Sequence, residues 1–335
     1  MTLSTKSNDH PACVISLILP VYNASARIRE CLLSLVNQEF VGSVEVILVD
    51  DCSTDDSATV CQEFVRQYPR LFNLIECKIN AGVSVARNIG LEMASGTYVM
   101  FVDSDGVLPP NSLDALVHAA EDHKADIVKG NIMYISEASS QFAPDRISRK
   151  RILRDEKILE ALFDHDEVRG HVHGKLFRRN KFGDLRFATG VNMAEDLLYF
   201  SAMFAQADSL VLICDAVYCY RKHQEGLSGL KYEKGTYVDW LAAVEKSGQF
   251  ATTKHQRRAH KRLQVRTLTQ MSREARHISS QYTGPVLDEI ERRIRMWNLR
   301  LLPLLISDRV GVRSLVRYVK LLLALAQVRR KFEHA

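Results

Sequence analysis

Residues 98–106 read YVMFVDSDG, a short apolar run that ends in Asp103 and Asp105. The first five residues are apolar or aromatic, which predicts a buried strand. Asp and Gly after a strand are also ordinary turn residues, because Asp bonds its own backbone and Gly tolerates positive φ. The two carboxylates therefore indicate a site only if other polar groups meet them at the same place.

Strands and helices alternate along the first 135 residues. We expect Thr54 to cap the second helix, Pro69 to stop it and Gly96 to close the third. Apolar strands separated by helices predict an α/β fold with a mostly parallel sheet flanked by helices. The predicted strands cover residues 13–22, 44–51, 72–77, 98–103 and 125–135, and the predicted helices cover residues 24–38, 53–69, 82–96 and 111–123.

Polar residues follow three of these strands. Pro20–Asn23 end the first strand, Asp50 and Asp51 end the second, and Asp103 and Asp105 end the fourth. Ligands of such sheets bind beyond the carboxyl ends of the strands. The sequence therefore predicts that the three clusters meet at one edge of the sheet and form a site there.

Charge divides the chain into two parts, although the net charge is only +5. Residues 236–335 carry 20 Lys/Arg against 8 Asp/Glu, whereas residues 1–235 carry 25 against 32. Opposite charge balances indicate different roles for the two parts. The expected organisation is a disordered lead (1–13), an α/β domain (14–235) with a first half of alternating strands and helices (14–135) and a second half of short elements (136–235), and a helical basic region (236–335).

Seven cysteines without a C-x-x-C pair are typical of reduced core residues, not of a disulfide framework or a zinc site. The first residues are polar and lack the apolar core of a secretory signal. No apolar run approaches the roughly 20 residues that a membrane span needs. We therefore expect a cytoplasmic protein.

Two carboxylates one residue apart suit a hard divalent cation. Mn²⁺ or Mg²⁺ prefers oxygen ligands and typically uses one or two protein carboxylates together with substrate phosphate oxygens. Asp103 and Asp105 therefore predict a metal that arrives with a diphosphate and neutralises its charge. Asp51 is placed to accept a hydrogen bond from a base or a ribose, and Tyr22 to stack on a base.

Four separated motifs resemble family 2 glycosyltransferases, inverting enzymes with the GT-A fold. The motifs are ILPVYNASARIRECLLSL, VEVILVDDCSTDDS, NAGVSVARNIGLEMASGTYVMFVDSDG and AEDLLYF, and they occur in the family's order within residues 14–228. The resemblance implies metal-dependent transfer of a sugar from a nucleotide-sugar donor, usually UDP-linked. The acceptor it implies is a glycan or a lipid-linked glycan in surface polysaccharide synthesis.

The resemblance also implies which residues bind the donor. The turn after the first strand would line the nucleotide pocket, and Asp51 would contact the base. Arg87 and Asn88 would lie near the nucleotide and its phosphates, Arg221 would meet phosphate, and Lys175 would face the diphosphate or position the acceptor loop. The complete donor-binding set is Pro20, Val21, Tyr22, Asn23, Asp51, Arg87, Asn88, Asp103, Ser104, Lys175 and Arg221.

The resemblance further implies which residues act on the acceptor and which bind the metal. Asp196 matches the general base that takes the proton of the acceptor hydroxyl, a role for which one positioned carboxylate suffices. Glu195 and His173 would lie on the acceptor side. The metal ligands would be Asp105, Asp103 and His223.

Two positions depart from the family's pattern. Gly106 stands where a third acid is frequent, and His173-Gly174 stands where Trp-Asn is common, so details of the acceptor do not transfer. His165, His171 and His173 are close enough in sequence to suggest zinc. The acids, cations and glycines around them favour a solvated acceptor loop instead.

The basic C-terminal region allows a second class of function. Residues 312–326 place Val and Leu at helical spacing with Arg and Lys around them. Such a helix binds an anionic membrane surface, which would put the protein on the inner face of the cell membrane, or packs on protein, including a second copy. A non-catalytic nucleotide-sugar-binding or partner-binding protein on the same fold is the alternative function. No nucleic-acid motif accompanies the charges.

Overall fold

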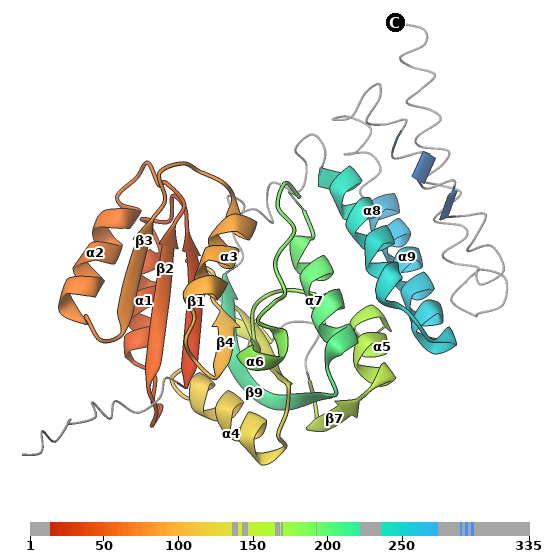
Figure 1. Cartoon of the computed structure of the whole chain (residues 1–335), viewed down its shortest axis with the longest axis horizontal. Helices are drawn as coiled ribbons and strands as arrows, with labels where there is room; N and C mark the ends of the chain where they lie inside the picture. The colour runs from red at the N-terminus through yellow and green to blue at the C-terminus, as the bar shows by residue number, and fades with distance from the viewer. Residues whose placement is uncertain are drawn as a thin grey trace, which may run out of the picture. The chain divides into compact units, whose positions relative to one another are not determined.

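The computed structural model describes most of the chain up to residue 273 (Figure 1). His223, His165, the lead over residues 1–13 and the amphipathic stretch over residues 312–326 lie outside the described residues. The described residues are 14–135, 140–142, 147–164, 168, 170–191, 193–221, 236–273, 289, 292, 293, 296 and 297.

The chain forms two compact units, each built from separate segments. The sheet unit comprises Met1–Leu153, Val172–Arg186 and Asp208–Arg221, and the helical unit comprises Arg154–His171, Phe187–Ala207 and Lys222–Ala335. None of the helices in the described part of the chain combines the length and apolar character that crossing a bilayer requires.

The sheet unit is built on one mixed, mostly parallel sheet with the strand order β3-β2-β1-β4-β8-β5-β9-β7, and β6 pairs with β5 beside this path. Helices flank it (Figure 1), as the α/β prediction required. Its strands are β1 Ile15–Val21, β2 Val44–Asp50, β3 Phe72–Glu76, β4 Tyr98–Phe101, β5 Ile127–Ile135, β6 Ser140–Phe142, β7 Arg151–Arg154, β8 Lys175–Arg178 and β9 Ser209–Arg221. Its helices are α1 Ile28–Val36, α2 Ser57–Gln67, α3 Val83–Met93, α4 Ser112–Asp122 and α6 Arg179–Phe182.

The predicted strands and helices up to residue 135 are all present, but the prediction of only short elements after residue 136 is wrong. β8 inserts antiparallel between β4 and β5, and β9 is 13 residues long and pairs with β5. The pairing of β5 with β9 shifts register between Lys129 and Ile132, which leaves Cys214 and Asp215 exposed in the middle of β9. These exposed residues break the apolar run by which a long buried strand is recognised.

The predicted cap of the second helix is wrong. α2 begins at Ser57, after Asp56, and Thr54 lies in the preceding loop. The backbone N–H of Thr54 donates to Asn23 Oδ1 at 2.8 Å, so Thr54 joins the loop after β2 to the turn after β1. The helix ends at Gln67, in agreement with a stop at Pro69.

Gly96 does not close the third helix, which ends at Met93. A Cβ atom on Gly96 would lie 2.7 Å from the backbone nitrogen of Ser16, closer than real Cβ atoms come. The glycine is therefore needed for the close approach of the chain to β1, a reason that a single sequence does not display.

The core of the sheet unit lies on both faces of β1 and β4, whose apolar residues are buried. α1 buries one stripe at helical spacing, formed by Ile28, Cys31, Leu32 and Leu35. All six described cysteines are free thiols, but only Cys31 and Cys61 are buried. The expectation of core cysteines therefore holds for these two alone among the described ones.

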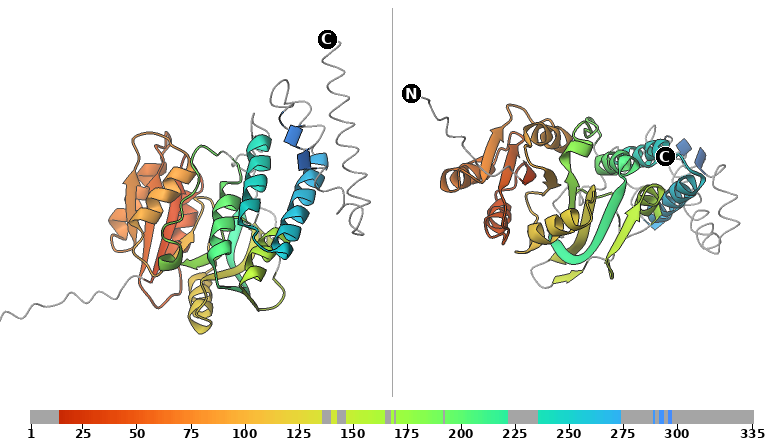
Figure 2. Two further views of the ribbon diagram at one scale, coloured as in Figure 1. Left: turned by 45° about the vertical axis from the view of Figure 1, so that its right-hand side comes forward. Right: turned by 60° about the horizontal axis from the view of Figure 1, so that its bottom comes forward.

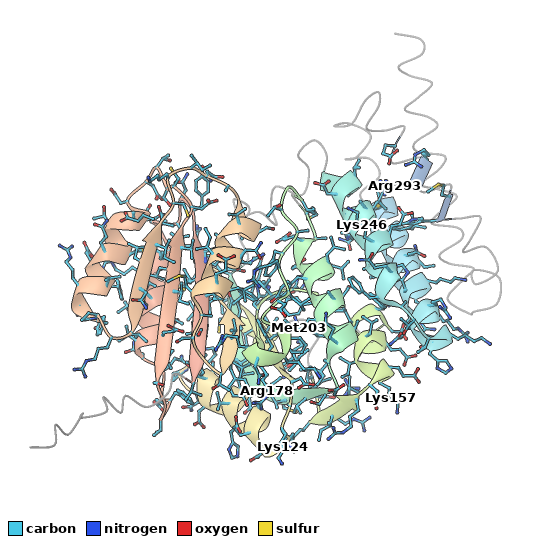
Figure 3. The ribbon with its side chains drawn as sticks, viewed as in Figure 1. Lys124, Lys157, Arg178, Met203, Lys246 and Arg293 are labelled. Atoms are coloured by element: carbon cyan, nitrogen blue, oxygen red, sulfur yellow. The ribbon has the colours of Figure 1, made fainter. Side chains whose placement is uncertain are left out.

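In residues 154–273, as far as the structure describes them, the helical unit packs four helices and one short 3₁₀ turn. Figures 1 and 2 show α8 and α9 side by side, and α5 also packs on α9. Met203, labelled in Figure 3, is fully buried on α7, and the rings of Phe187 and Tyr199 stack with centroids 4.0 Å apart. The elements are α5 Glu156–Asp164, α7 Glu195–Gln206, α8 Thr236–Ser247, η1 Gly248–Phe250 and α9 Lys254–Arg273.

His260 on α9 is a buried structural histidine. It is 8% exposed, its Nε2 bonds the carbonyl of Val244 at 2.6 Å, and its ring meets Phe163 edge-on. Burial lowers the pKa of His260 below its ordinary 6.5. The unfolded chain therefore binds this proton more readily than the folded chain does.

We expect the free energy of unfolding to be at its full value above about pH 6.5 and to fall as the pH drops below it, with a contribution from His260 of at most about 1.4 kcal/mol per pH unit. His260→Gln keeps a donor near the Val244 carbonyl and does not titrate. Urea unfolding at pH 7.5 and pH 5.5 should show a smaller loss for this variant. Equal losses in the two proteins would contradict the role of His260.

Candidate active site

The carboxyl ends of three neighbouring parallel strands bring together the polar clusters predicted from the sequence. β1 pairs in parallel with β2 on one side and with β4 on the other. The turn at Pro20–Asn23 and the residues Asp51 and Asp103 therefore follow adjacent strands at one edge of the sheet. Val21 is buried at the end of β1, whereas Tyr22 is 50% exposed, as a surface for stacking requires.

Asn23 ties the turn after β1 to the loop after β2. Its backbone adopts a φ of 45°, in the left-handed region that Asn tolerates better than most residues. Its backbone N–H donates to Ser53 Oγ at 3.1 Å, and its side-chain oxygen accepts the N–H of Thr54 at 2.8 Å. Asn23 therefore holds together the two loops that follow β1 and β2 at the carboxyl edge of the sheet.

Asp51 is 3% exposed and holds the start of α3. Its Oδ1 accepts the backbone N–H of Ala81 at 2.8 Å, and its Oδ2 accepts that of Gly82 at 2.7 Å. Gly82 has a φ of 90°, which favours glycine. Asp51 thus fixes the loop before α3, and each of its oxygens keeps a lone pair that a ligand N–H or O–H could use.

Asp103 lies between two cationic or hydrogen-bonding side chains. His173 Nδ1 is 3.0 Å from its Oδ2, and Arg87 Nη2, on α3, is 3.4 Å from its Oδ1. Loss of solvent alone would raise the pKa of the Asp103 carboxyl, but the hydrogen bond and charge of His173 and the charge of Arg87 lower it to about 2. Asp103 is therefore a fixed, ionised carboxylate.

Two tyrosines of β9 complete the surroundings of Asp103, and sequence reasoning missed their contacts. The ring of His173 stacks on Tyr218, with centroids 5.0 Å apart, and packs on Tyr220 at 5.1 Å. The hydroxyl of Tyr218 accepts the backbone N–H of Asp103 at 3.1 Å. The Y-x-Y pattern at 218–220 was a visible signal, but the long β9 that carries it was not predicted.

Gly106 is a glycine because Tyr218 leaves no room for a side chain. A Cβ atom at this position would lie 2.0 Å from the Tyr218 hydroxyl oxygen and 2.5 Å from its Cζ. Tyr218 is fully buried, so it has little space to move away. Tyr218 therefore occupies the space into which a third acid would project.

The Asp103–Gly106 turn presents the second carboxylate. The N–H of Gly106 donates to the carbonyl of Asp103 at 2.9 Å, which closes a tight turn around Ser104 and Asp105. Asp103 and Asp105 are the two carboxylates of this turn, and both oxygens of Asp103 contact protein groups. Within the described residues no three His, Cys, Asp or Glu side chains gather as a metal site. The donor set therefore fits Mn²⁺ or Mg²⁺ that draws its other ligands from a diphosphate and water.

The remaining predicted donor residues of the sheet unit lie on β8, β9 and α3. Lys175 is 1% exposed on β8, in register with Lys129 of β5. Arg221 ends β9 and contacts Glu30 of α1, with Nη2 2.7 Å from the carboxylate. Asn88 is half-buried on α3, one residue after Arg87.

The predicted acceptor-side pair lies in the helical unit, at the start of α7. Glu195 and Asp196 occupy its first turn. Asp196 Oδ1 accepts the N–H of Leu197 at 2.7 Å, and Oδ2 is 3.8 Å from His171 Nδ1. Ala194, just before the helix, has a left-handed φ of 63°, a conformation that non-glycine residues rarely adopt and that is enriched at functional sites.

The histidines considered for zinc do not form a cluster in the described residues. His173 belongs to the sheet unit and bonds Asp103, whereas His171 belongs to the helical unit and lies beside Asp196. Each therefore has a carboxylate of its own unit as its neighbour.

Similarity to known proteins agrees with this geometry. The chain is 30% identical over 237 residues to glycosyltransferase GlyA of Streptococcus pneumoniae, which covers 69% of this chain and 33% of that protein. It is 29% identical over 224 residues to the uncharacterized glycosyltransferase EpsJ of Bacillus subtilis, with 66% of this chain and 64% of that protein covered. The chain thus spans between a third and two thirds of the length of these two relatives.

Solved structures share the fold at low sequence identity. TarS 1–349 of S. aureus in complex with UDP-GlcNAc has a TM-score of 0.65 and 19% identity, with 96% of this chain and 92% of that chain covered. The mannosyltransferase PcManGT of Pyrobaculum calidifontis in complex with GDP-Man and Mn²⁺ has a TM-score of 0.58 and 17% identity, with 95% and 90% covered. The mixed sheet of this chain is therefore of the GT-A type.

The family model of glycosyl transferase family 2 matches residues 16–186, slightly more than half of the chain. The matched segment contains the three strand-end clusters and His173. Together with the named relatives and the fold, this match shows that the chain belongs to glycosyl transferase family 2.

Proposed function

We propose that this protein transfers a sugar, with inversion, from a nucleotide diphosphate sugar to a hydroxyl of a glycan or lipid-linked glycan. The observation that carries the proposal is the set of carboxylates Asp51, Asp103 and Asp105 at the carboxyl edge of β1, β2 and β4. This edge is where doubly wound sheets bind nucleotides.

Each of the three carboxylates has one role in binding the donor. Asp51 accepts a hydrogen bond from the base, next to the exposed ring of Tyr22. Asp103, held ionised by His173 and Arg87, accepts a hydroxyl of the ribose or the sugar. Asp105 holds Mn²⁺ or Mg²⁺, which when bound stabilises the negative charge of the departing diphosphate.

Asp196 acts as the general base on the acceptor hydroxyl. The acceptor oxygen attacks the anomeric carbon, its proton passes to an Asp196 carboxylate oxygen, and the bond between the anomeric carbon and the diphosphate oxygen breaks. The diphosphate leaves with the electron pair, so no acid is needed to protonate it, unlike the leaving oxygen in glycosidases. His171, 3.8 Å from Asp196 on the same unit, is placed to orient the carboxylate.

The relatives support a UDP-linked donor and a cell-surface product. TarS was solved with UDP and with UDP-GlcNAc, whereas PcManGT was solved with GDP-Man and Mn²⁺. Curated relatives include a minor teichoic acid biosynthesis protein of Bacillus subtilis and a poly(ribitol-phosphate) beta-glucosyltransferase of Bacillus spizizenii. These names favour a UDP-sugar over a GDP-sugar and a surface polymer over a small acceptor. Placement at the inner face of the membrane would suit such an acceptor.

Thermal unfolding with UDP, GDP, CMP and their common sugars, each with Mn²⁺ or EDTA, tests the donor class. Selective binding of one nucleotide at 100 times its Kd stabilises the fold by about 2.7 kcal/mol. We expect this stabilisation with UDP and its sugars, its loss in EDTA, and its loss in Asp105→Asn. Asp114→Asn, a change of an exposed acid on α4, is the matched control. Stabilisation that is unchanged by EDTA would refute the metal, and none with any nucleotide would refute the donor site.

A further inference from the structure

Among the described helices, α9 carries the largest excess of positive charge, and it contains no residue of the proposed donor site. This helix contains seven Lys/Arg and no Asp/Glu. α5, which packs on it, contributes three acids and one lysine. The two helices together therefore carry five excess positive charges.

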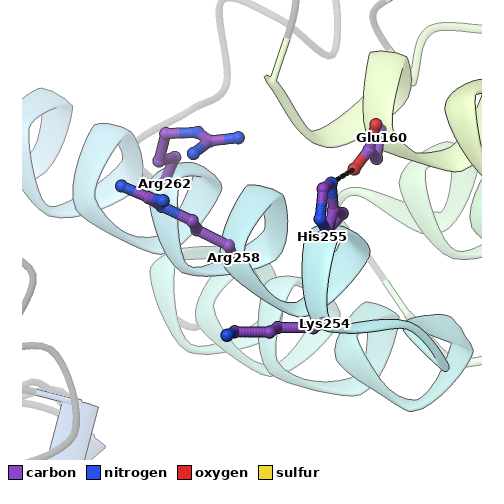
Figure 4. Close-up of a pocket in the computed structure, with 5 residues that line it drawn as sticks. All are labelled: Glu160, Lys254, His255, Arg258 and Arg262. Atoms are coloured by element: carbon purple, nitrogen blue, oxygen red, sulfur yellow. Dashed lines mark ion pairs between the residues drawn. The ribbon is translucent and has the colours of Figure 1, made fainter.

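A pocket of about 300 Å³ opens between α5 and α9. Figure 4 shows Lys254 and Arg258 extending to the same side of α9, while His255 meets Glu160 of α5. The lining residues are Glu160, Lys254, His255, Arg258 and Arg262. Positions 254, 258 and 262 are four residues apart, so their side chains form one stripe along the helix.

The acids of α5 neutralise only part of this charge. Asp164 binds Arg262 through both carboxylate oxygens, at 2.5 and 2.6 Å, and also lies 3.7 Å from Arg266. Glu160 lies 3.6 Å from His255. Lys254 is exposed beside these pairs, so the wall of the pocket remains cationic.

The charge pattern also opposes the stability of the helix. Lys254 and Arg257 lie in the first turn of α9, which has no acidic residue. The helix dipole is positive at this end, so each exposed cation there lowers the stability of the helix. Local conflicts of this kind are expected where a sequence serves binding.

The pocket suits a phosphorylated chain better than a bilayer. A helix that lies in a membrane surface needs an exposed apolar face. The apolar residues Ala259, Leu268 and Met271 of α9 are buried within the helical unit. The exposed face is therefore cationic without an apolar component, which fits an anionic chain in water.

We propose that the α5–α9 pocket binds the phosphate groups of an anionic acceptor chain. This inference rests on the proposed function, because it gives the glycan acceptor a chemical class: a polymer that carries phosphodiester groups. Lys254 and Arg258 contact the phosphates, and Arg262, held by Asp164, lines the pocket beside them.

The test measures binding of fluorescent linear polyphosphate by anisotropy, with a neutral dextran of similar length as the uncharged probe. The variant is the full chain with Lys254→Glu and Arg258→Glu. The control reverses two other exposed lysines, Lys124 and Lys246, to Glu, which makes a matched change in net charge. We expect the pocket variant to bind polyphosphate about tenfold more weakly with a shallower salt dependence, and the control to bind within about twofold.

Three outcomes separate this inference from the proposed function. Equal weakening in both variants would overturn it, because the attraction would then be one of overall charge. A second result would overturn it in favour of a membrane surface: the unaltered protein binds anionic phosphatidylglycerol vesicles but not polyphosphate, and the pocket variant no longer binds the vesicles. The metal-dependent stabilisation by UDP should persist in the pocket variant, and its absence in the unaltered protein would refute the donor site instead.

Discussion

Asp196→Asn is expected to lower the turnover of sugar transfer by about 10²–10⁴-fold while the donor still binds. The substitution removes the group that takes the proton from the acceptor hydroxyl. Asp196 lies in the first turn of α7, where its Oδ1 accepts the N–H of Leu197. The oxygen of Asn can accept the same bond, so the helix start should be kept and the loss should be chemical.

Steady-state kinetics and the thermal shift with UDP distinguish a loss of the chemical step from a loss of donor binding. The loss should fall on kcat, and the stabilisation by UDP should match that of the unaltered protein. Glu156→Gln, a change of an exposed acid in the first turn of α5, is the matched control and should retain most of the activity. Turnover of the Asp196→Asn enzyme within a few-fold of normal would show that another group is the base.

Gly106→Ala is expected to destabilise the sheet unit by about 1–3 kcal/mol and to weaken metal-dependent donor binding. The new Cβ would meet the Tyr218 hydroxyl at 2.0 Å, and the fully buried ring of Tyr218 has little room to move. The turn from Asp103 to Gly106 would then shift instead, and it carries Asp105. Gly183→Ala is the control, because Gly183 has a helical φ of −61° and its nearest contact would be 3.1 Å.

A double-mutant cycle identifies Tyr218 as the cause. In a Tyr218→Leu background the side chain no longer reaches the position of the hydroxyl, so adding Gly106→Ala should cost much less. Urea unfolding of the four proteins gives the coupling energy, which we expect to be at least 1 kcal/mol, on the order seen for residues in contact. Additive effects would show that Gly106 is required for its backbone and not for the space that Tyr218 fills.

Local patterns were sufficient to predict the first four strands and the edge at which their polar residues meet. β1, β2 and β4 each contain at least four consecutive apolar residues, and their parallel pairing follows from the helices between them. The sequence alone therefore assigns Asp51 and Asp103 to one edge of the sheet.

The rest of the candidate site depends on pairings between distant segments, which periodicity does not reveal. β8 is four residues long, and β9 is interrupted by exposed residues, so neither stands out as a sheet strand. The contacts of His173 and Tyr218 with Asp103 arise only once these strands join the sheet. The same holds for Gly106, whose missing side chain is explained by a residue 112 positions later in the chain.

The insertion of β8 between β4 and β5 also governs how the chain can assemble during synthesis. β1 to β4 are joined by short crossovers and can pair as they leave the ribosome. The outer edge of β4 stays unpaired until residues 175–178 follow, 74 residues after Phe101, which takes about 4–15 s at ordinary elongation rates. During that interval the nascent sheet presents an open strand edge to other chains. Slow codons before residue 175 would lengthen the exposure and raise the risk of aggregation.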